Sequence, residues 1–143
     1  IEPQAGIMRK AREAMNAYGL ENFRLMESSE VAMMVELSNA IRHQKWLVVT
    51  GWLPHWSFAR WSLKFLDDPK NVFGDRGSIN TAVRQGLETD MPQVYRVLDN
   101  FFWEPQDVGQ LMLWIQEDEG RFPYEKALRW MRTHPDKIDK WVE

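Results

Sequence analysis

Residues 48–56 read Val48-Val49-Thr50-Gly51-Trp52-Leu53-Pro54-His55-Trp56. The apolar run 46–49 leads into this stretch, and its two adjacent valines are typical of a short strand buried on both faces of a parallel sheet. Gly51 allows the backbone to turn where the strand ends, and Pro54 suits the first turn of a following helix. Open α/β sheets bind ligands at the carboxyl ends of their strands, so Trp52 is placed to form an aromatic wall for a ligand. The alternative is that Trp52, one of 8 tryptophans, is a core side chain.

The bulk composition describes one globular domain. The chain has 143 residues, of which 44% are hydrophobic and 27% are charged, which is enough apolar material to bury a core. The formal net charge of -3 argues against nucleic-acid binding, which needs a basic face. Because the chain has 0 Cys, it contains no disulfide, thiolate nucleophile or Cys-based metal site. No apolar run approaches the roughly 20 residues of a membrane-spanning helix.

Two kinds of element are predicted around the opening stretch. Towards the amino terminus, apolar periodicity predicts helices over 7–18 and 31–41 and strands over 23–26 and 46–50. Helices that alternate with buried strands form a parallel sheet with right-handed crossovers. Towards the carboxyl terminus the segments that begin at a proline or a small polar residue predict helices alone, over 79–87, 92–101, 105–116, 123–133 and 135–141. We therefore predict an α/β lobe over 1–74 and a helical part over 75–143 that packs on it.

Local signals mark the ends of the first two helices and the start of the chain. Gly19 is a candidate for the left-handed residue that follows the first helix, and Ser28-Ser29-Glu30 supplies an N-cap for the second. The chain begins with Ile1-Glu2-Pro3, without Met, signal peptide or capping pattern. These residues resemble the last residues of a strand whose first residues are missing. We therefore expect a processed chain or a segment of a longer protein.

Residues suited to catalysis are few. The 3 histidines are scattered, and no HExxH, GxSxG, Walker A or GxGxxG motif is present. Asp67-Asp68 and Glu117-Asp118-Glu119 are better explained as a helix end and a solvated loop than as acid–base pairs. A small-molecule enzyme is therefore the weaker reading, and the sequence indicates no cofactor and no metal.

Two junctions between a strand and a helix carry more information. The indole face of Trp52 could attract a cation, and cages of aromatic side chains select quaternary ammonium ligands. At residues 1–6 the chain leaves a strand and enters a helix, where backbone N–H groups and the helix dipole attract carboxylates and phosphates. The two junctions together would suit a zwitterion with a methylated ammonium group and a carboxylate.

Several motifs resemble the substrate-binding proteins of glycine betaine, proline betaine and choline ABC importers. They are Ile1-Glu2-Pro3-Gln4-Ala5-Gly6-Ile7-Met8, Ser28-Ser29-Glu30-Val31-Ala32-Met33 and the Gly51-Trp52-Leu53-Pro54-His55-Trp56 run. The likeness continues through Leu63-Lys64-Phe65-Leu66-Asp67-Asp68-Pro69-Lys70 and into the helical tail. It covers nearly all of this chain but about half of a typical member, which has two α/β lobes that close on the ligand.

The resemblance implies a fold, a site and partners. The fold is α/β, a three-layer lobe of a type II periplasmic-binding-protein fold with a helical C-terminal extension. Trp52 matches a wall of the family's aromatic box, and Ile1 and Pro3 match the junction whose backbone holds the ligand carboxylate. His55 and Trp56 belong to the same motif, whereas Glu2 and Gln4 depart from the family's Ile-Asp-Pro-Gly. We expect packing or surface roles for the tryptophans outside the motif, Trp61, Trp103, Trp114, Trp130 and Trp141.

The implied function is capture of a quaternary-ammonium osmoprotectant and its delivery to a membrane permease with its ATPase, at a periplasmic or cell-surface location. A competing reading is a protein-interaction module, because Trp and Met in the helical tail favour interfaces. An unpaired sheet edge at the start of the chain could also pair with a second copy and give a domain-swapped dimer.

Overall fold

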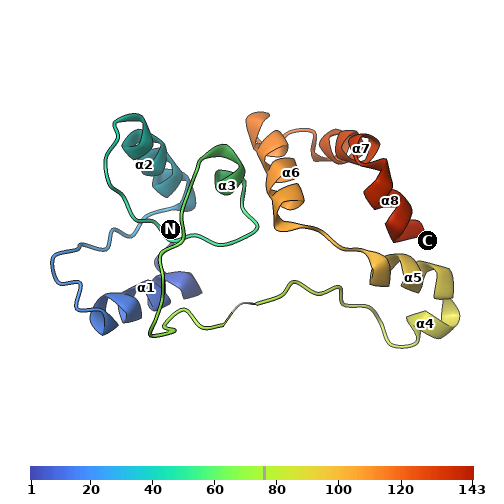
Figure 1. The fold of residues 1–143 in the computed structure, drawn as a ribbon, viewed down its shortest axis with the longest axis horizontal. Helices are drawn as coiled ribbons and strands as arrows, with labels where there is room; N and C mark the ends of the chain where they lie inside the picture. Colours follow the sequence, from blue (N-terminus) through green and yellow to red (C-terminus); the bar gives the residue numbers. More distant parts are fainter. Residues whose placement is uncertain (76) are drawn as a thin grey trace. The chain divides into compact units, whose positions relative to one another are not determined.

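The computed structural model describes residues 1–75 and 77–143, which form two compact units (Figure 1). Unit 1 comprises Ile1–Trp52 and Lys64–Gly77, and unit 2 comprises Leu53–Leu63 and Ser78–Glu143. The described residues form eight helices, and the ladder of backbone hydrogen bonds that would define a strand is absent from them. Within that part of the chain, no helix has the length and apolar character needed to cross a bilayer.

Unit 1 contains the two helices predicted near the amino terminus, α1 (Gly6–Ala17) and α2 (Glu30–Arg42). Both end signals are confirmed. Gly19 has a φ of 63°, in the left-handed region that glycine adopts without strain. The Ser29 hydroxyl accepts a hydrogen bond from the Ala32 backbone N–H at 3.2 Å, so Ser29 is the N-cap of α2.

The core of unit 1 is formed mainly by methionines. Met8 of α1 and Met33, Met34 and Leu37 of α2 are buried. The apolar periodicity that predicts this helix, at Val31, Met34, Leu37, Ala40 and Ile41, places Val31 on the buried face, but Val31 is 74% exposed. The buried face instead includes Met33, whose sulfur is contacted by two other segments of the unit, at Ile1 and Thr50.

A polar cluster fixes the end of α1 to the segment 64–77. The Tyr18 hydroxyl donates a hydrogen bond to Asp68 and accepts one from the Lys70 backbone N–H at 2.8 Å. The second Asp68 carboxylate oxygen accepts from the Phe73 N–H at 2.8 Å. The Lys70 ammonium group donates to the Ala17 carbonyl and lies 5.1 Å from the centre of the Tyr18 ring. Polar groups from two segments that are distant in sequence thus satisfy one another.

The prediction of strands over 23–26 and 46–50 is not met in this structure. Both segments are non-helical, and neither is paired in a ladder. Trp46 is 102% exposed and Val48 is 63% exposed, although the apolar run predicted burial on both faces. A strand exists only where a neighbouring strand takes up its backbone N–H and C=O groups. An apolar run identifies a segment that a sheet could bury, but it does not provide the neighbouring strand.

Unit 2 contains the remaining helices. Its first, α3 (Trp56–Arg60), packs against α6 (Pro105–Glu117). The others are α4 (Leu87–Asp90), α5 (Pro92–Asn100), α7 (Pro123–Thr133) and α8 (Pro135–Val142). The starts predicted at Pro92, Pro105, Pro123 and Pro135 are confirmed. Proline is favoured there because its φ is already helical and the first helical N–H has no intrahelical partner.

The helix predicted over 79–87 was wrong. Residues 79–86 are not helical, and α4 begins only at Leu87. Gly86, the residue before α4, has a φ of 84°. A helix that reached this point from the amino-terminal side would have to end there, since positive φ is incompatible with a right-handed helix.

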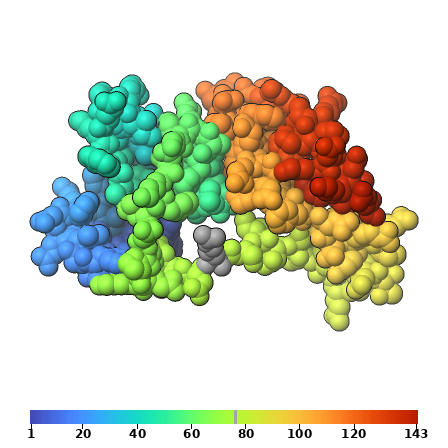
Figure 2. Space-filling view, in the orientation of Figure 1, coloured from blue at the N-terminus to red at the C-terminus, as the bar shows by residue number. Residues whose placement is uncertain are grey.

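Aromatic rings form the core of unit 2. The Trp130 ring is 1% exposed and stacks on His134 with a centroid distance of 4.2 Å and an interplanar angle of 10°. Trp103 lies 4.6 Å and Trp141 5.9 Å from the Trp130 ring, and Phe101 contacts both of these tryptophans. In Figure 2 the spheres of α7 and α8 (red) lie directly against each other, as these contacts require. Of the two roles expected for Trp103, Trp130 and Trp141, packing or surface, the structure shows packing.

Replacing Tyr18 by Phe should lower the melting temperature by a few degrees, because Asp68 and the Lys70 N–H each lose a partner. The Tyr18 hydroxyl and the Phe73 N–H hold the pKa of Asp68 below its usual range. Stability from a lowered carboxyl pKa is complete above the unfolded-state pKa of about 4 and is lost as pH falls through the folded-state pKa. Thermal melts should therefore show a difference between the wild type and Tyr18→Phe that shrinks below about pH 4. Tyr124→Phe, at an exposed position, is the control; a pH-independent difference would contradict this account.

Replacing Trp130 by Ala should lower the free energy of unfolding by about 3 to 5 kcal/mol, because a fully buried indole is lost and a cavity remains. Trp46→Ala removes an indole that is 102% exposed and should change the free energy of unfolding by no more than about 0.5 kcal/mol. Urea denaturation measures both values. Equal losses for the two variants would show that Trp130 is not a core residue.

Candidate functional site

The first predicted junction lies at the start of unit 1. Ile1 is buried, and its amino group lies 3.9 Å from the Met33 sulfur. The Ile1 carbonyl accepts a hydrogen bond from the Ser28 backbone N–H at 3.2 Å. Pro3 is exposed, and its carbonyl accepts a hydrogen bond from the Arg12 guanidinium at 3.4 Å. The backbone at the start of the chain is therefore held by α1, by α2 and by the residue that precedes the α2 cap.

The second junction contacts the same methionine. The Thr50 hydroxyl lies 3.4 Å from the Met33 sulfur and donates to it. Trp52 follows two residues later and is 36% exposed, so part of its indole is accessible from solvent. One sulfur atom on α2 thus holds both Ile1 and Thr50. The structure thus brings Ile1 and Thr50, one residue from each junction, to the same side chain.

The helix starts at these junctions differ in their electrostatics. At α2 the Glu2 carboxylate accepts a hydrogen bond from the Glu30 N–H at 3.2 Å. Hydrogen bonds from the backbone N–H groups of Glu2 itself and of Glu30 lower the pKa of Glu2. At α1 no side chain caps the first turn, and that turn contains no acidic residue. The start of α2 is already supplied with anionic and hydroxyl acceptors, while the first turn of α1 keeps donors for another acceptor.

The other two predicted residues lie in unit 2. His55 is 5% exposed and is the N-cap of α3, where its Nδ1 accepts from the Ser57 backbone N–H at 3.2 Å. Trp56 is half-buried, with its ring centroid 5.4 Å from that of His55. Within unit 1 the structure contains Ile1, Pro3 and Trp52, and within unit 2 it joins His55 and Trp56. Along the chain, only two residues separate Trp52 from His55.

Two tryptophan rings outside the predicted site each have an arginine side chain over one face. The Arg60 guanidinium lies 5.3 Å from the centre of the Trp61 ring, and that of Arg129 lies 4.5 Å from the centre of the Trp114 ring. Such contacts satisfy the negative face of an indole. They agree with the packing or surface roles expected for Trp61 and Trp114, and they distinguish these rings from a ligand wall.

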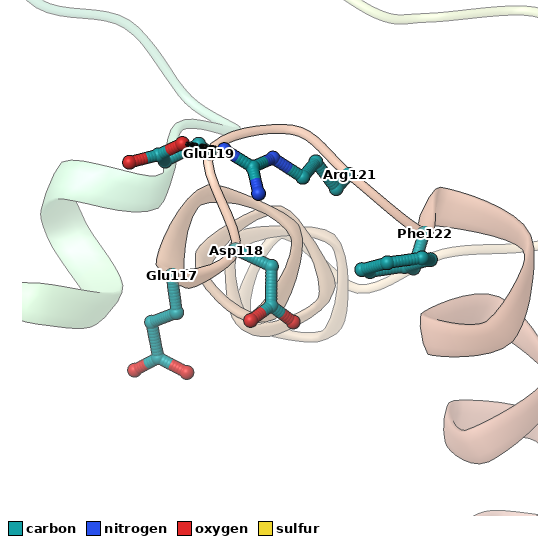
Figure 3. Close-up of a pocket in the computed structure, with 5 residues that line it drawn as sticks. All are labelled: Glu117, Asp118, Glu119, Arg121 and Phe122. Carbon is teal, nitrogen blue, oxygen red and sulfur yellow. Dashed lines mark hydrogen bonds and ion pairs between the residues drawn. The ribbon is translucent and has the colours of Figure 1, made fainter.

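A separate hollow lies at the turn between α6 and α7 (Figure 3), where it is lined by Glu117, Asp118, Glu119, Arg121 and Phe122. The carboxylates would attract a cation, but Glu119 pairs with Arg121 and Asp118 pairs with Lys126. The single aromatic ring cannot form a cage. Across the described ranges, no cluster of three His, Cys, Asp or Glu side chains has the arrangement of a metal site.

Comparison with known proteins shows which family this chain matches. Residues 1–133 match OpuAC, the substrate binding domain of ABC-type glycine betaine transport system. The chain belongs to this family. The glycine betaine/carnitine transport binding protein GbuC of Listeria monocytogenes is 45% identical to it over 145 residues, which include 100% of this chain and 48% of GbuC.

Solved structures agree with the sequence match. Lactococcal OpuAC, crystallised closed with glycine betaine, is 43% identical with a TM-score of 0.76 over 100% of this chain and 56% of its own. The glycine betaine, L-proline-binding protein ProX of Borrelia burgdorferi is 35% identical with a TM-score of 0.72 over 100% of this chain and 54% of its own. These neighbours place this chain among periplasmic binding proteins. The chain spans about half the length of these relatives.

Two residues of the site were missed by sequence reasoning. Met33 was not assigned to the apolar face of α2, although its sulfur joins Ile1 and Thr50. Ser57, which is 3% exposed, contacts His55. The signal that could have found Ser57 was its place two residues after a histidine at a helix start, where an N-cap finds its donor. No comparable signal marked Met33.

Replacing His55 by Ala should lower the free energy of unfolding by about 1 kcal/mol or more, because α3 loses its N-cap acceptor. His55→Asn keeps a side-chain acceptor that suits an N-cap, so it should lose less than His55→Ala. Urea denaturation of both variants measures the difference. If Asn were no better than Ala, the cap would not be the stabilising role of His55.

Proposed function

We propose that this chain is one lobe of a two-lobe substrate-binding protein, and that it binds a quaternary-ammonium osmoprotectant such as glycine betaine together with the second lobe. Trp52 would form one wall of an aromatic box, and the backbone at Ile1 and Pro3 would receive the ligand carboxylate. The observation that carries this proposal is the shared contact of Ile1 and Thr50 with the Met33 sulfur.

The chemistry of the ligand fits these two junctions. A trimethylammonium group donates no hydrogen bonds, so a polar site would gain nothing from it, whereas an indole face attracts its charge and excludes water from its methyl groups. A carboxylate is favoured by unpaired backbone N–H groups at a helix start. The first turn of α1 has neither a side-chain cap nor an acidic residue, which supports this assignment. Binding needs no covalent step, and the chain would not act as an enzyme.

The same proposal includes a β-sheet in the complete protein. In the complete protein the segments 23–26 and 46–50 would pair as strands of an α/β lobe, which would cover Trp46 and Val48. The helical part over 75–143 would pack on the lobe formed by 1–74. In the chain alone, a domain-swapped dimer through the open sheet edge stays a prediction.

Delivery would depend on partners. A closed two-lobe protein would present the ligand to the membrane permease and ATPase of an ABC importer, and closure around a hinge would distinguish the loaded from the empty form. Such a role requires a periplasmic or extracytoplasmic cell-surface location. The names of the relatives, which are ABC-type binding proteins for glycine betaine and related ligands, support this assignment.

A protein-interaction module is the second candidate. It is favoured by exposed aromatic side chains in unit 2, where Phe102 is 66% and Tyr124 is 71% exposed. Phe102 lies in the connection between α5 and α6, whereas Tyr124 lies in the first turn of α7. If the chain is a protein-interaction module, its binding to a partner protein should not depend on Trp52.

Titration with glycine betaine, followed by tryptophan fluorescence, separates the candidates. The full-length protein that contains this chain should give a saturable response, and Trp52→Leu should weaken its affinity about 2- to 30-fold, which corresponds to about 0.5 to 2 kcal/mol of lost cation–π attraction. The 143-residue chain alone should respond weakly or not at all, because one lobe leaves most of the ligand in water.

The matched control is Tyr124→Leu, which removes an aromatic ring that is 71% exposed in unit 2 and should leave affinity unchanged. Choline and carnitine, titrated in parallel, establish which ammonium ligand is preferred. If the full-length protein gave no saturable response to any methylated ammonium, the transport function would be refuted. A micromolar response from the isolated chain would refute the two-lobe site.

A further inference from the structure

The first junction of the proposed site is attached to the start of helix α2. The Ile1 carbonyl accepts a hydrogen bond from the Ser28 N–H at 3.2 Å, immediately before the cap of this helix. The Glu2 carboxylate accepts one from the Glu30 N–H, also at 3.2 Å. Two consecutive residues of the junction are therefore held by the backbone at one end of α2, and all four residues belong to unit 1.

The second junction is attached to the Met33 side chain, about one turn further along the same helix. The Thr50 hydroxyl donates to the Met33 sulfur at 3.4 Å, two residues before Trp52. The Ile1 nitrogen lies 3.9 Å from the same sulfur, and Ile1 and Met33 are both 8% exposed. The nitrogen of one junction and the hydroxyl of the other therefore cannot be farther apart than these two contacts together.

The contact with Thr50 distinguishes Met33 from the methionine that follows it. A thioether sulfur accepts a weak hydrogen bond, and the unbranched side chain adapts to partners on both sides. Leucine at position 33 would have a similar volume, but it would leave the part-buried Thr50 hydroxyl without this acceptor. Met34 is 9% exposed, and its sulfur has no hydrogen-bonded partner among the described residues. The two methionines are thus alike in burial and differ in this contact.

We infer that Met33 is a positioning residue, which keeps the two junctions at a short separation and thereby selects betaines with a short chain between the ammonium group and the carboxylate. The inference rests on the proposed function for its ligand, whereas the contact between Met33 and Thr50 lies within unit 1 alone. Glycine betaine has a single methylene group between its two charged groups, and γ-butyrobetaine has two more. A ligand that must force two braced junctions apart loses affinity, so the longer betaine should bind less tightly.

Isothermal titration of the full-length protein with glycine betaine and with γ-butyrobetaine tests this selection. The wild type should prefer glycine betaine. Met33→Leu and Thr50→Val should each reduce the ratio of the two affinities about three-fold, the equivalent of one weak hydrogen bond. The double variant should show no larger change than either single variant, because both substitutions remove the same contact. Thr50→Ser keeps the hydroxyl and should restore the ratio, and Met34→Leu is the matched control that should leave it unchanged.

Spectra of isotope-labelled methionine methyl groups report on the contact itself, without ligand. The Met33 signal should shift in Thr50→Val and keep its position in Thr50→Ser. An unmoved signal in Thr50→Val would show that the contact is absent, and the inference would be overturned.

The titrations can also contradict the inference. A wild type that prefers γ-butyrobetaine, an unchanged ratio in Met33→Leu, or an equal change in Met34→Leu would show that Met33 contributes packing only. Additive losses in the double variant would assign Met33 and Thr50 to separate contacts. If the wild type bound no methylated ammonium, the proposed function would fail and the selection of ligands with it. The methyl spectra would still decide whether Met33 contacts Thr50.

Discussion

The contact of two separate segments with one methionine sulfur is the constraint on which unit 1 depends. Met33 lies in the first turns of α2, and its sulfur receives the amino group of Ile1 and the hydroxyl of Thr50. Sulfur is a weak acceptor, so these contacts contribute little individually. Their effect is geometric, because a polarisable, unbranched side chain adapts to both partners while the rest of α2 packs through Met34 and Leu37. The buried face of α2 includes Met33 and leaves Val31 exposed.

Much of the helical structure could be predicted because its signals are local. A proline at a helix start, a serine at an N-cap and a glycine at positive φ each act through their own backbone, whatever the surroundings. The failures concern signals whose meaning depends on other segments. The run 46–49 has the composition of a buried strand, but burial and pairing must come from neighbouring strands. The helix predicted over 79–87 was wrong as well, and the left-handed Gly86 explains why no single helix runs from this segment into α4.

The residues of the candidate site could be singled out from the sequence, whereas the contacts that hold them in place could not. Trp52 and the junction at Ile1 could be singled out because a strand-to-helix junction has known preferences for ligands. The contact of both Ile1 and Thr50 with Met33 could not be predicted, since a methionine in an amphipathic helix has no signature that distinguishes a core contact from a junction. His55 was found through its motif, but its role as the cap of α3 requires the position of Nδ1 relative to Ser57. A sequence thus identifies candidate ligand-binding residues more readily than the residues that hold them in place.

Four consecutive helices, α5 to α8, each begin with a proline at the first helical position. A proline cannot be absorbed into a helix that arrives from the amino-terminal side, so each of these helices has a start that cannot migrate. Insertions or deletions in the loop before α7 would therefore change loop length without shifting the position of Trp130 within its helix. The connection between α5 and α6 is different, because it carries Phe101 and Trp103 of the aromatic core and its length is therefore constrained.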